Sequence, residues 1–461
     1  MNGSEGKLKK EYVMTMLYDR TPGLVSVIIS AYNYACYLVD VLESLKKQTY
    51  LAIEILVIDD YSGDDTEIVV NEWFDANRDR FNDCIYIRLP RNLGAEWAVN
   101  IGLCLSKGEY VVLHDADDIS HEEKIEKQVK YFQENPDTAA LGTSYSIFHD
   151  DISNSVDSSN WLSFDAETIE KNYKGKTVHC VCYGTLMIKA YIIDEIIGFN
   201  KAVLIANDVF FVSNIINHDF IVNNLRENLF FVRKHDKQIS NNLYESDFIR
   251  SYEEKRKKSK GLVSVVLPIN NNLNKVMEAL ESIASQTYKK IELIVVAEHP
   301  NNETEEFIRK WAKEYIDDGK FQELVYFPLL REVGFPWIYN IGAYLCKGEF
   351  IAFHNVEGKS DPKRIEKQVE FLESNFMYSV VGTNYNDSRD YIKFDDEIEY
   401  SYNVDFMPCI NFNTILLRSE IIDKTGGMNK NIDGAEDFEF VFNLLHSGYR
   451  VQNLSDILYF Q

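Results

Sequence analysis

The chain of 461 residues carries a formal net charge of −25, and 45% of its residues are hydrophobic. This length and composition indicate roughly two to four folded domains and argue against a disordered protein. The strong negative charge argues against a protein that binds the phosphate backbone of nucleic acids, because such proteins need a basic face.

Cysteine content and hydropathy bear on the compartment. Seven cysteines, an odd total, give no disulfide framework. No apolar run approaches the length of a membrane span, and residues 1–21 lack the apolar core of a signal peptide. We therefore expect a cytoplasmic protein without a transmembrane segment. The sequence leaves open both peripheral association with a membrane and homo-oligomerisation.

Apolar runs alternate with amphipathic stretches along the first half of the chain. The predicted elements are, in order, a strand Leu24–Ile29, a helix Leu38–Gln48, a strand Ile53–Ile58 and a later strand Glu109–Leu113. Strands that alternate with helices in this way are typical of βαβ units. We therefore expect an α/β fold with a mostly parallel central sheet.

Carboxylates follow two of these strands at the point where each one ends. Asp59 and Asp60 follow the second predicted strand, and Asp115, Asp117 and Asp118 follow the last one. Because ligands of open α/β sheets bind outside the carboxyl ends of the strands, we expect both groups to share one crevice. Like charges this close repel unless a cation lies among them, which favours a site for Mg²⁺ or Mn²⁺. The alternative is an acidic loop before a helix, where the helix dipole favours Asp.

The second half of the chain repeats the first. Gln48–Tyr50 recurs as Gln286–Tyr288, at an offset of 286 − 48 = 238 residues. Asn100–Gly102 recurs as Asn340–Gly342, at an offset of 340 − 100 = 240 residues. Such a long offset indicates duplication of a whole domain of roughly 200 residues, not a short solenoid repeat.

The repeat predicts four segments. They are an N-terminal extension 1–21, a first domain 22–240, a linker helix 241–260 and a second domain 261–461. The linker holds a charged run, Glu253–Lys258, which we interpret as part of a solvated helix and not as a basic recognition patch.

Five blocks in the first domain carry a resemblance to a known family. They are Val25–Asn33, Gln48–Tyr50, Val57–Ser62, Arg91–Gly94 and Asp115–Asp118. In their order and spacing they resemble a family 2 glycosyltransferase of GT-A fold over nearly all of residues 22–240. The second domain resembles the same family with losses. The resemblance implies two tandem GT-A domains with a Rossmann-like, mostly parallel sheet.

The resemblance implies transfer of a sugar from a nucleotide diphosphate, by family habit UDP, to a hydroxyl of a glycan or glycoconjugate, with inversion. Polysaccharide or glycoprotein biosynthesis would be the setting. The donor-binding residues that it implies are Ser30, Tyr32, Asp59, Asp60, Arg91, Asp115 and Arg233. The implied ligands of a Mn²⁺ or Mg²⁺ ion are Asp117, Asp115 and His235. The metal would neutralise the charge of the diphosphate leaving group.

The acceptor hydroxyl needs a general base within hydrogen-bond reach. In the second domain, Glu436-Asp437 resembles the acidic helix start of the family, and the first domain has Asn207-Asp208 at this place. The resemblance implies Asp208 as the base. From the residues alone, an Asp208 that serves as a plain helix N-cap is equally compatible.

The second domain has lost most of its acidic residues. Ala297-Glu298 stands in place of Asp59-Asp60, and His354–Gly358 keeps one carboxylate, Glu357, of the acidic cluster. We therefore expect a degenerate second domain. The chain stops at Gln461, before an equivalent of Arg233–His235, so that either the protein ends there or the sequence continues.

Two alternatives remain open at this point. One is a bifunctional transferase that uses both domains, and the other is a non-catalytic protein that binds a carbohydrate or a partner. A nucleotidyltransferase is less well supported, because Ser30–Asn33 is not a Gly-rich phosphate loop.

Overall fold

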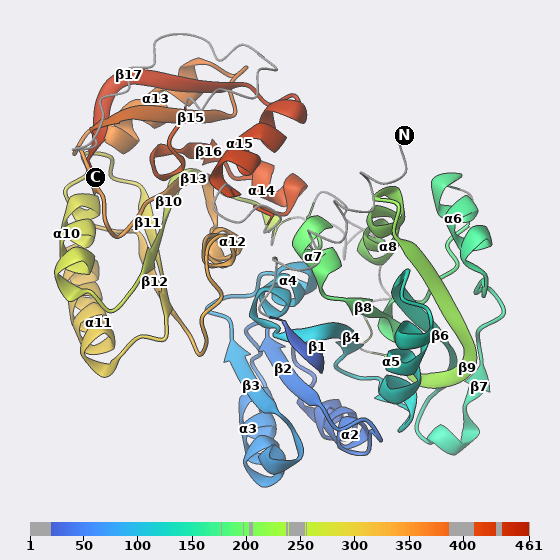
Figure 1. Cartoon of the computed structure of the whole chain (residues 1–461). Coiled ribbons are helices and arrows are strands. Elements are labelled where there is room, and N and C mark those ends of the chain that lie inside the picture. Colours follow the sequence, from blue (N-terminus) through green and yellow to red (C-terminus); the bar gives the residue numbers. More distant parts are fainter. Residues whose placement is uncertain are drawn as a thin grey trace. The chain divides into compact units, whose positions relative to one another are not determined.

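The computed structural model describes residues 20–460 except for 177, 197, 202–205, 237, 239–253, 255, 387–409 and 430–435. The chain divides into two compact units, Met1–Lys255 and Arg256–Gln461, which we call unit 1 and unit 2. Figure 1 draws unit 1 in blue to green and unit 2 in yellow to red. The predicted extension 1–21 and linker helix 241–260 lie almost entirely outside the described residues.

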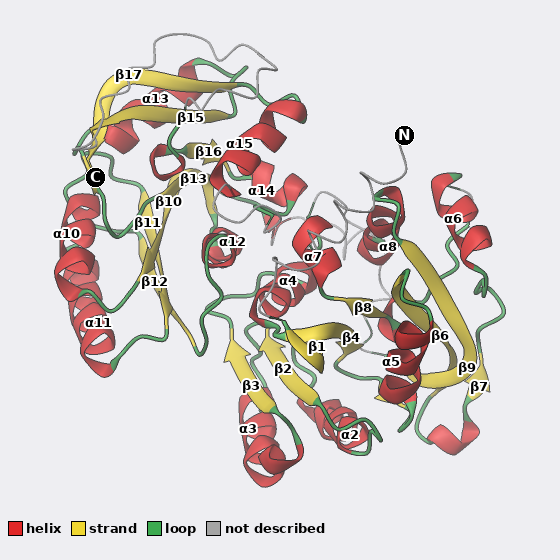
Figure 2. Cartoon of the chain, viewed as in Figure 1, coloured by secondary structure: helices red, strands yellow, loops and turns green. Residues whose placement is uncertain are grey.

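Unit 1 is built on one twisted sheet flanked by helices (Figure 2). Its strands are β1 (Thr21–Ala31), β2 (Ile53–Asp59), β3 (Asp83–Arg88), β4 (Gly108–Asp115), β5 (Ile119–Ser120), β6 (Thr138–Phe148), β7 (Val156–Asp157), β8 (Met187–Lys189) and β9 (Ile221–Arg233). Its helices are α2 (Ala35–Lys46), α3 (Thr66–Asn77), α4 (Ala95–Leu105), α5 (Lys124–Glu134), α6 (Ala166–Lys174), α7 (Tyr191–Ile196) and α8 (Asn207–Asn217), with short 3₁₀ turns η1 (Arg78–Arg80), η2 (Ile152–Asn154) and η3 (Tyr183–Thr185).

The strand order of unit 1 is β3-β2-β1-β4-β8-β6-β9-β5, with β7 beside β6. The strands β3, β2, β1 and β4 pair in parallel, and α2, α3 and α4 connect them as a βαβ pattern requires. Beyond β4 the sheet is mixed, because β8 pairs antiparallel with both β4 and β6. The predicted α/β class is confirmed. The register places Ser30 beside Asp115 and Ala31 beside Asp59, so the carboxyl ends of three strands meet at one edge.

Both faces of the parallel part of this sheet are buried. Val27 and Ile29 pack with α2 into one apolar cluster, whereas Ile28 packs with α4 and α8 into another. Side chains alternate between the faces of a strand, so a strand that is covered on both faces is apolar at successive positions. This is why β1 is a continuous apolar run in the sequence.

Unit 2 repeats this architecture. Its strands are β10 (Ser259–Ile269), β11 (Ile291–Glu298), β12 (Glu323–Leu329), β13 (Gly348–Phe353), β14 (Lys359–Ser360), β15 (Val380–Asn386), β16 (Leu416–Arg418) and β17 (Val451–Phe460). Its helices are α10 (Leu273–Ala284), α11 (Asn302–Asp317), α12 (Trp337–Leu345), α13 (Arg364–Ser374), α14 (Glu420–Thr425) and α15 (Glu436–His446), with the 3₁₀ turn η5 (Phe412–Thr414). Its strand order, β12-β11-β10-β13-β16-β15-β17-β14, is that of unit 1 element for element. Among the helices of the described residues, none combines the length and the apolar character needed to cross a bilayer.

The repeated Asn-Ile-Gly motif ties α4 to the segment between α7 and α8 in unit 1, and α12 to the segment between α14 and α15 in unit 2. Asn100 donates its amide to the carbonyl of Phe199 (2.8 Å) and accepts from the N–H of Phe199 (2.7 Å). Asn340 makes the same pair of hydrogen bonds with Met428, at 2.8 Å each. Both amides are buried, where an unmade hydrogen bond is costly, so the motif belongs to the frame of each unit.

The glycine of this motif predicts a stability defect. A Cβ at Gly102 would lie 2.5 Å from Cγ2 of Ile28, and a Cβ at Gly342 would lie 2.3 Å from Cγ1 of Val266. We expect Gly102→Ala to lower the free energy of unfolding by about 1–3 kcal/mol, because the helix must move off the strand. Urea denaturation measures this loss. Gly63→Ala is the control, since its Cβ would meet Asn33 at an unstrained 3.8 Å; an unchanged Gly102→Ala would contradict the packing account.

Candidate active site

A cavity of about 870 Å³ opens at the edge of the unit 1 sheet where the carboxyl ends of β1, β2 and β4 meet. The predicted site residues in its wall are Ser30, Tyr32, Asp60, Asp115, Asp117 and Asp208. The predicted residues that are not among its wall residues are Asp59, Arg91, Arg233 and His235. The structure thus brings together groups that lie up to 178 residues apart in the chain (208 − 30 = 178).

Asp60 grips the loop that leads into α4. Its Oδ1 accepts a hydrogen bond from the N–H of Leu93 (2.6 Å), and its Oδ2 accepts one from the N–H of Gly94 (2.8 Å). Burial raises the pKa of Asp60 to about 7, although these two hydrogen bonds and the charge of Lys201 act in the opposite direction. This carboxylate therefore sets the shape of one cavity wall and also faces the cavity.

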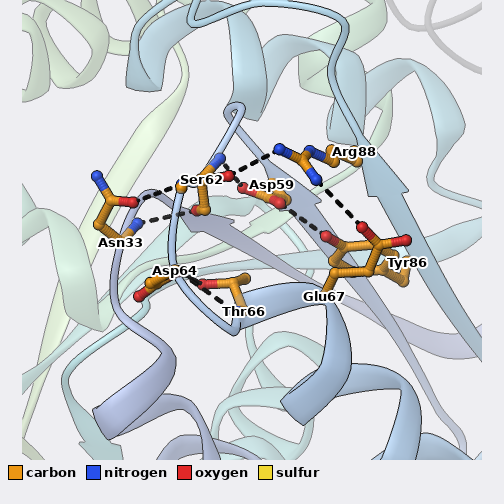
Figure 3. A network of polar contacts seen from close by, with 9 residues as sticks. Asn33, Asp59, Ser62, Asp64, Thr66, Glu67, Tyr86 and Arg88 are labelled. Atoms are coloured by element: carbon orange, nitrogen blue, oxygen red, sulfur yellow. Dashed lines mark hydrogen bonds and ion pairs between the residues drawn. The ribbon is translucent and has the colours of Figure 1, made fainter.

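Asp59 does not line the cavity and instead joins a polar network (Figure 3). Its Oδ1 accepts from the N–H of Ser62 (2.8 Å), and its Oδ2 accepts from the hydroxyl of Tyr86 (2.6 Å). The Ser62 hydroxyl accepts from the N–H of Asn33 (2.9 Å), and Arg88 donates to the Ser62 carbonyl (2.8 Å). Asp59 thus fixes the loop after β2, and its oxygens are engaged there.

Asp115, Asp117 and Asp118 form the acidic cluster at the end of β4. The side chain of Asp115 is exposed to the cavity but is otherwise surrounded by protein. This partial loss of hydration, together with the charges of Asp117 and Asp208, raises the pKa of Asp115 to about 7. Burial and the charges of Asp115 and Asp117 raise the pKa of Asp118 well above its usual range. The absence of a side chain at Gly184 makes room for the cluster, because a Cβ there would lie 2.9 Å from Oδ2 of Asp115. The cluster holds negative charge that the surrounding protein balances incompletely.

The segment that ends β9 closes over this cluster. The N–H of Arg233 donates to Oδ1 of Asp118 (2.9 Å), and its Nε donates to the carbonyl of Asp117 (2.9 Å). The Arg233 guanidinium pairs with Asp40 (2.8 Å) and is buried. His235 Nε2 lies 2.9 Å from Oδ2 of Asp117, so two of the three predicted metal ligands are in contact. Within the described residues, no three His, Cys, Asp or Glu side chains converge in a way that could hold a metal ion.

Lys234 is a cavity residue that the sequence analysis missed. It lines the cavity, and its charge acts on Asp118 by lowering the raised pKa of that carboxyl. The strand β9 ends at Arg233, so Lys234 lies just beyond it, where the alternation of side chains no longer fixes their direction. The sequence therefore gave no way to choose between the two neighbouring cations.

Asp208 lines the cavity from the first turn of α8. The helix begins at Asn207, and its N-cap residue is Ala206, so Asp208 is not the N-cap. The charge of Asp208 raises the pKa of Asp115 and opposes the effect of burial on His179. The carboxylate is thus close enough to both residues to influence their protonation.

In unit 2, Glu298 keeps the grip on the corresponding loop. Its Oε1 accepts hydrogen bonds from the N–H groups of Val333 and Gly334, at 2.7 Å each. These are the equivalents of Leu93 and Gly94 in unit 1. The longer side chain thus replaces Asp60 as the holder of the loop.

Other groups replace the acidic cluster at the end of the corresponding strand in unit 2. The Tyr459 hydroxyl accepts a hydrogen bond from the N–H of Asn355 (3.1 Å). A Cβ at Gly358 would lie 2.1 Å from this hydroxyl, so Tyr459 occupies the place that the side chain of Asp118 takes in unit 1. Glu357, the remaining carboxylate, lies 3.4 Å from the ammonium of Lys275. In unit 2 a hydroxyl and an ion pair with a lysine therefore stand where unit 1 has carboxylates that repel one another.

The same α/β architecture is present twice in one chain, with acidic strand ends in unit 1, and it defines a tandem GT-A protein. The chain belongs to glycosyl transferase family 2, whose model matches residues 26–197 and 264–427. The resemblance found in the sequence is thereby confirmed, and the two matched regions lie one in each unit.

Two curated relatives are similar to this chain. An uncharacterized glycosyltransferase of Rickettsia felis is 27% identical over 414 residues, which cover 77% of this chain and 65% of the relative. Glycosyltransferase GlyG of Streptococcus pneumoniae is 35% identical over 128 residues, 28% of this chain and 41% of the relative. The chain thus spans less than two thirds of the length of these relatives.

Two solved structures are similar at low identity. Residues 1–349 of S. aureus TarS in complex with UDP share 21% identity over 46% of this chain and 60% of that chain, with a TM-score of 0.38. The mannosyltransferase PcManGT of Pyrobaculum calidifontis in complex with GDP-Man and Mn²⁺ shares 18% identity over 50% of this chain and 65% of that chain, with a TM-score of 0.37. Likeness at this level identifies neither the donor nor the acceptor of this protein.

The raised pKa of Asp60 predicts a pH-dependent stability. Its folded pKa of about 7 lies above the ordinary value of 3.8, so its contribution to stability is full at low pH and is lost as the pH rises through 7. The free energy of unfolding of the wild type, minus that of Asp60→Asn, should fall from pH 5.5 to 7.5 by up to about 1.4 kcal/mol per pH unit. Urea titrations at each pH measure it.

The control is Asp165→Asn, because a hydrogen bond with Thr168 lowers the pKa of Asp165 and keeps its titration below this pH range. A difference between wild type and Asp60→Asn that does not change with pH would contradict the assignment.

The Tyr459 hydroxyl predicts a coupled pair of substitutions. Gly358→Asp should destabilise the protein by about 1–3 kcal/mol, because its Cβ would overlap the Tyr459 hydroxyl. A Cβ at Gly358 would also lie 2.4 Å from Cζ of the Tyr459 ring, so Gly358→Asp combined with Tyr459→Ala should recover part of this loss. Thermal unfolding of both single variants and the double variant measures the coupling; strictly additive effects would contradict a shared space.

Proposed function

We propose that unit 1 transfers a sugar from a nucleotide diphosphate, with UDP as the first candidate, to a hydroxyl group of a glycan or glycoconjugate, with inversion. The observation that carries this proposal is the single cavity whose wall joins Asp60, Asp115, Asp117 and Asp208. Membership of glycosyl transferase family 2 supports it. The family resemblance and the acidic side chains of this cavity together also favour a divalent metal ion.

The nucleotide half of the donor is assigned to the side of the cavity near β1 and β2. Asp60, Ser30 and Tyr32 line this side, and Asp59 acts indirectly by holding the loop after β2. Arg91 lies in the turn between β3 and α4, next to the loop that Asp60 grips. We assign it to the donor with less direct support, because it is not a wall residue.

We place a divalent ion at the acidic cluster, where two of its three predicted ligands, Asp117 and His235, are in contact. The raised pKa values of Asp115 and Asp118 indicate negative charge that an additional cation would stabilise. Asp117 and His235, with Asp115 nearby, would hold the ion, and oxygens of the diphosphate would complete its coordination. A bound metal ion of this kind would stabilise the charge on the departing diphosphate.

Lys234 is the protein cation that we assign to the diphosphate. Arg233 was the expected residue, but its guanidinium is paired with Asp40, its Nε donates to the carbonyl of Asp117, and its backbone N–H donates to Asp118. We therefore assign Arg233 the role of positioning the acidic cluster. Lys234 faces the cavity and supplies positive charge beside this cluster.

Asp208 is assigned as the general base. Its carboxylate takes the proton of the acceptor hydroxyl while the hydroxyl oxygen forms a bond to the anomeric carbon. The bond from that carbon to the diphosphate breaks, and the diphosphate leaves with the electron pair. Attack from the side opposite the leaving group inverts the configuration. The position of Asp208 on α8, away from the strand ends that carry the acidic cluster, supports this division of roles.

Unit 2 is proposed as a non-catalytic domain kept for folding, pairing or acceptor binding. Tyr459 fills the place of one carboxylate, and Lys275 already pairs with the other. The bifunctional alternative has one observation in its favour, the retained grip of Glu298 on its loop. A loop without the acidic cluster offers no equivalent metal site, so we favour a single active unit.

Asp208→Asn tests the proposed function. We expect it to lower the rate of UDP release from a UDP-sugar by at least about 100-fold, because a general base contributes that much or more. Its affinity for UDP should stay within about twofold of the wild type, since the assigned nucleotide contacts lie elsewhere. UDP release is measured over a panel of UDP-hexoses and UDP-N-acetylhexosamines with methyl pyranosides as acceptors, and affinity is measured by calorimetry.

Asp165→Asn, an exposed helix N-cap outside the cavity, is the matched control and should keep the wild-type rate. An Asp208→Asn variant with full activity would remove Asp208 from the mechanism.

A further inference from the structure

The cavity has an aromatic wall made by Tyr145, Trp161 and His179, and all three residues line it. They come from β6, from the segment between β7 and α6, and from the segment between α6 and η3. None of them contributes to the acidic cluster or to the loop that Asp60 grips. The proposed donor site therefore leaves this side of the cavity without a role.

Contacts among the aromatic side chains hold the wall in place. Trp161 Nε1 donates a hydrogen bond to the hydroxyl of Tyr145 (2.8 Å), and the rings of Trp161 and His179 lie 4.9 Å apart between centroids at 34°. The hydroxyl of Tyr173 lies 2.6 Å from Nδ1 of His179. Because the polar atoms of Trp161 and Tyr145 bond to each other, the rings are fixed and offer mainly apolar surface to the cavity.

Two of the three wall residues, Trp161 and His179, belong to unit 1 alone in the sequence, whereas Tyr145 recurs as Tyr385. The frame residues Asn100 and Gly102 recur in unit 2, but the stretch 387–411, which corresponds to 147–182, contains neither Trp nor His. A feature that folding of the repeat required would be expected in both copies. The restriction of Trp161 and His179 to the copy with the acidic cluster links the wall to the activity of that copy.

The wall stands beside the proposed base. Asp208 lines the same cavity as the three aromatic residues, and α6, which precedes His179 in the chain, packs against α8, which carries Asp208. The neighbouring Asn207 also lines the cavity, so the carboxylate of Asp208 and the amide of Asn207 supply polar groups on this side of it. Apolar ring faces and acceptors for hydroxyl groups thus adjoin one another.

We propose that this wall is the acceptor subsite and that it takes a pyranose ring, packed through its C–H face on Trp161, with its nucleophilic hydroxyl toward Asp208. A pyranose has an apolar face and a rim of hydroxyl donors, which matches this combination of groups. An open-chain polyol has no such flat face. The inference rests on the proposed transferase function and narrows its acceptor. Trp161 is on this account a positioning residue.

The test measures weak binding to the full chain by saturation-transfer-difference NMR, with and without UDP. The probes are methyl β-D-glucopyranoside, methyl β-D-galactopyranoside and methyl 2-acetamido-2-deoxy-β-D-glucopyranoside, and ribitol is the open-chain comparison. We expect saturable binding of at least one pyranoside, strongest saturation on its ring C–H protons, and weaker binding of ribitol.

Three variants make this test specific. Trp161→Ala should raise the Kd of the pyranoside by about threefold to tenfold, because one aromatic contact is lost. Trp161→Phe should recover most of the affinity. Tyr191→Ala removes a partly exposed ring on α7 outside the cavity and should change nothing. Thermal unfolding and UDP affinity, measured on each variant, show that the fold and the donor site are intact.

Absence of pyranoside binding, equal binding of ribitol, or an unchanged Kd in Trp161→Ala would overturn the acceptor assignment. With UDP binding intact, such a result leaves the proposed function standing. Absence of UDP binding by the wild type would instead contradict the proposed function. In that case the titrations without UDP would still measure whether the aromatic wall binds a pyranoside.

Discussion

Repulsion among the carboxylates at the end of β4 is the constraint on which the site of unit 1 depends. Asp115, Asp117 and Asp118 lie together, and two of them have raised pKa values. The protein supports them with the backbone N–H and the Nε of Arg233 and with His235. Unpaired charge in such a position lowers stability, so its retention points to a partner that binds there.

Unit 2 shows the same fold without this repulsion among carboxylates. The strand order, the asparagine that ties α12 to Met428 and the glycine that packs on β10 are those of unit 1. At the strand ends, however, the Tyr459 hydroxyl occupies carboxylate space and Lys275 pairs with Glu357. The two units therefore share the features that packing requires and differ in the residues at the strand ends. Ligand binding would account for the acidic residues that unit 1 keeps there.

The sequence predicted the parts of the site that depend on strand ends. Asp60, Asp115 and Asp117 follow parallel strands, so their convergence follows from the topology of the sheet. Asp208 was predicted differently, by comparison with Glu436-Asp437 at the equivalent place of the second domain. The residues that it misplaced depend on side-chain direction. Asp59 turns to Ser62 and Tyr86, and Arg233 turns to Asp40 while Lys234 faces the cavity.

Other features lay beyond any local pattern. Trp161 and His179 meet across α6, and no periodicity in the sequence links two irregular segments of this kind. The role of Tyr459 became visible only from its distance to Gly358, since the chain places them 101 residues apart (459 − 358 = 101).

We infer that each chain has one metal-dependent donor site and that this site lies in unit 1. It can be tested by calorimetric titration of UDP, GDP and dTDP, with Mn²⁺ or with a chelator, on the full chain and on Asp117→Ala. We expect that one nucleotide binds at one site per chain, that the chelator weakens binding, and that Asp117→Ala abolishes it. Two sites per chain, or binding that neither the chelator nor Asp117→Ala affects, would contradict it.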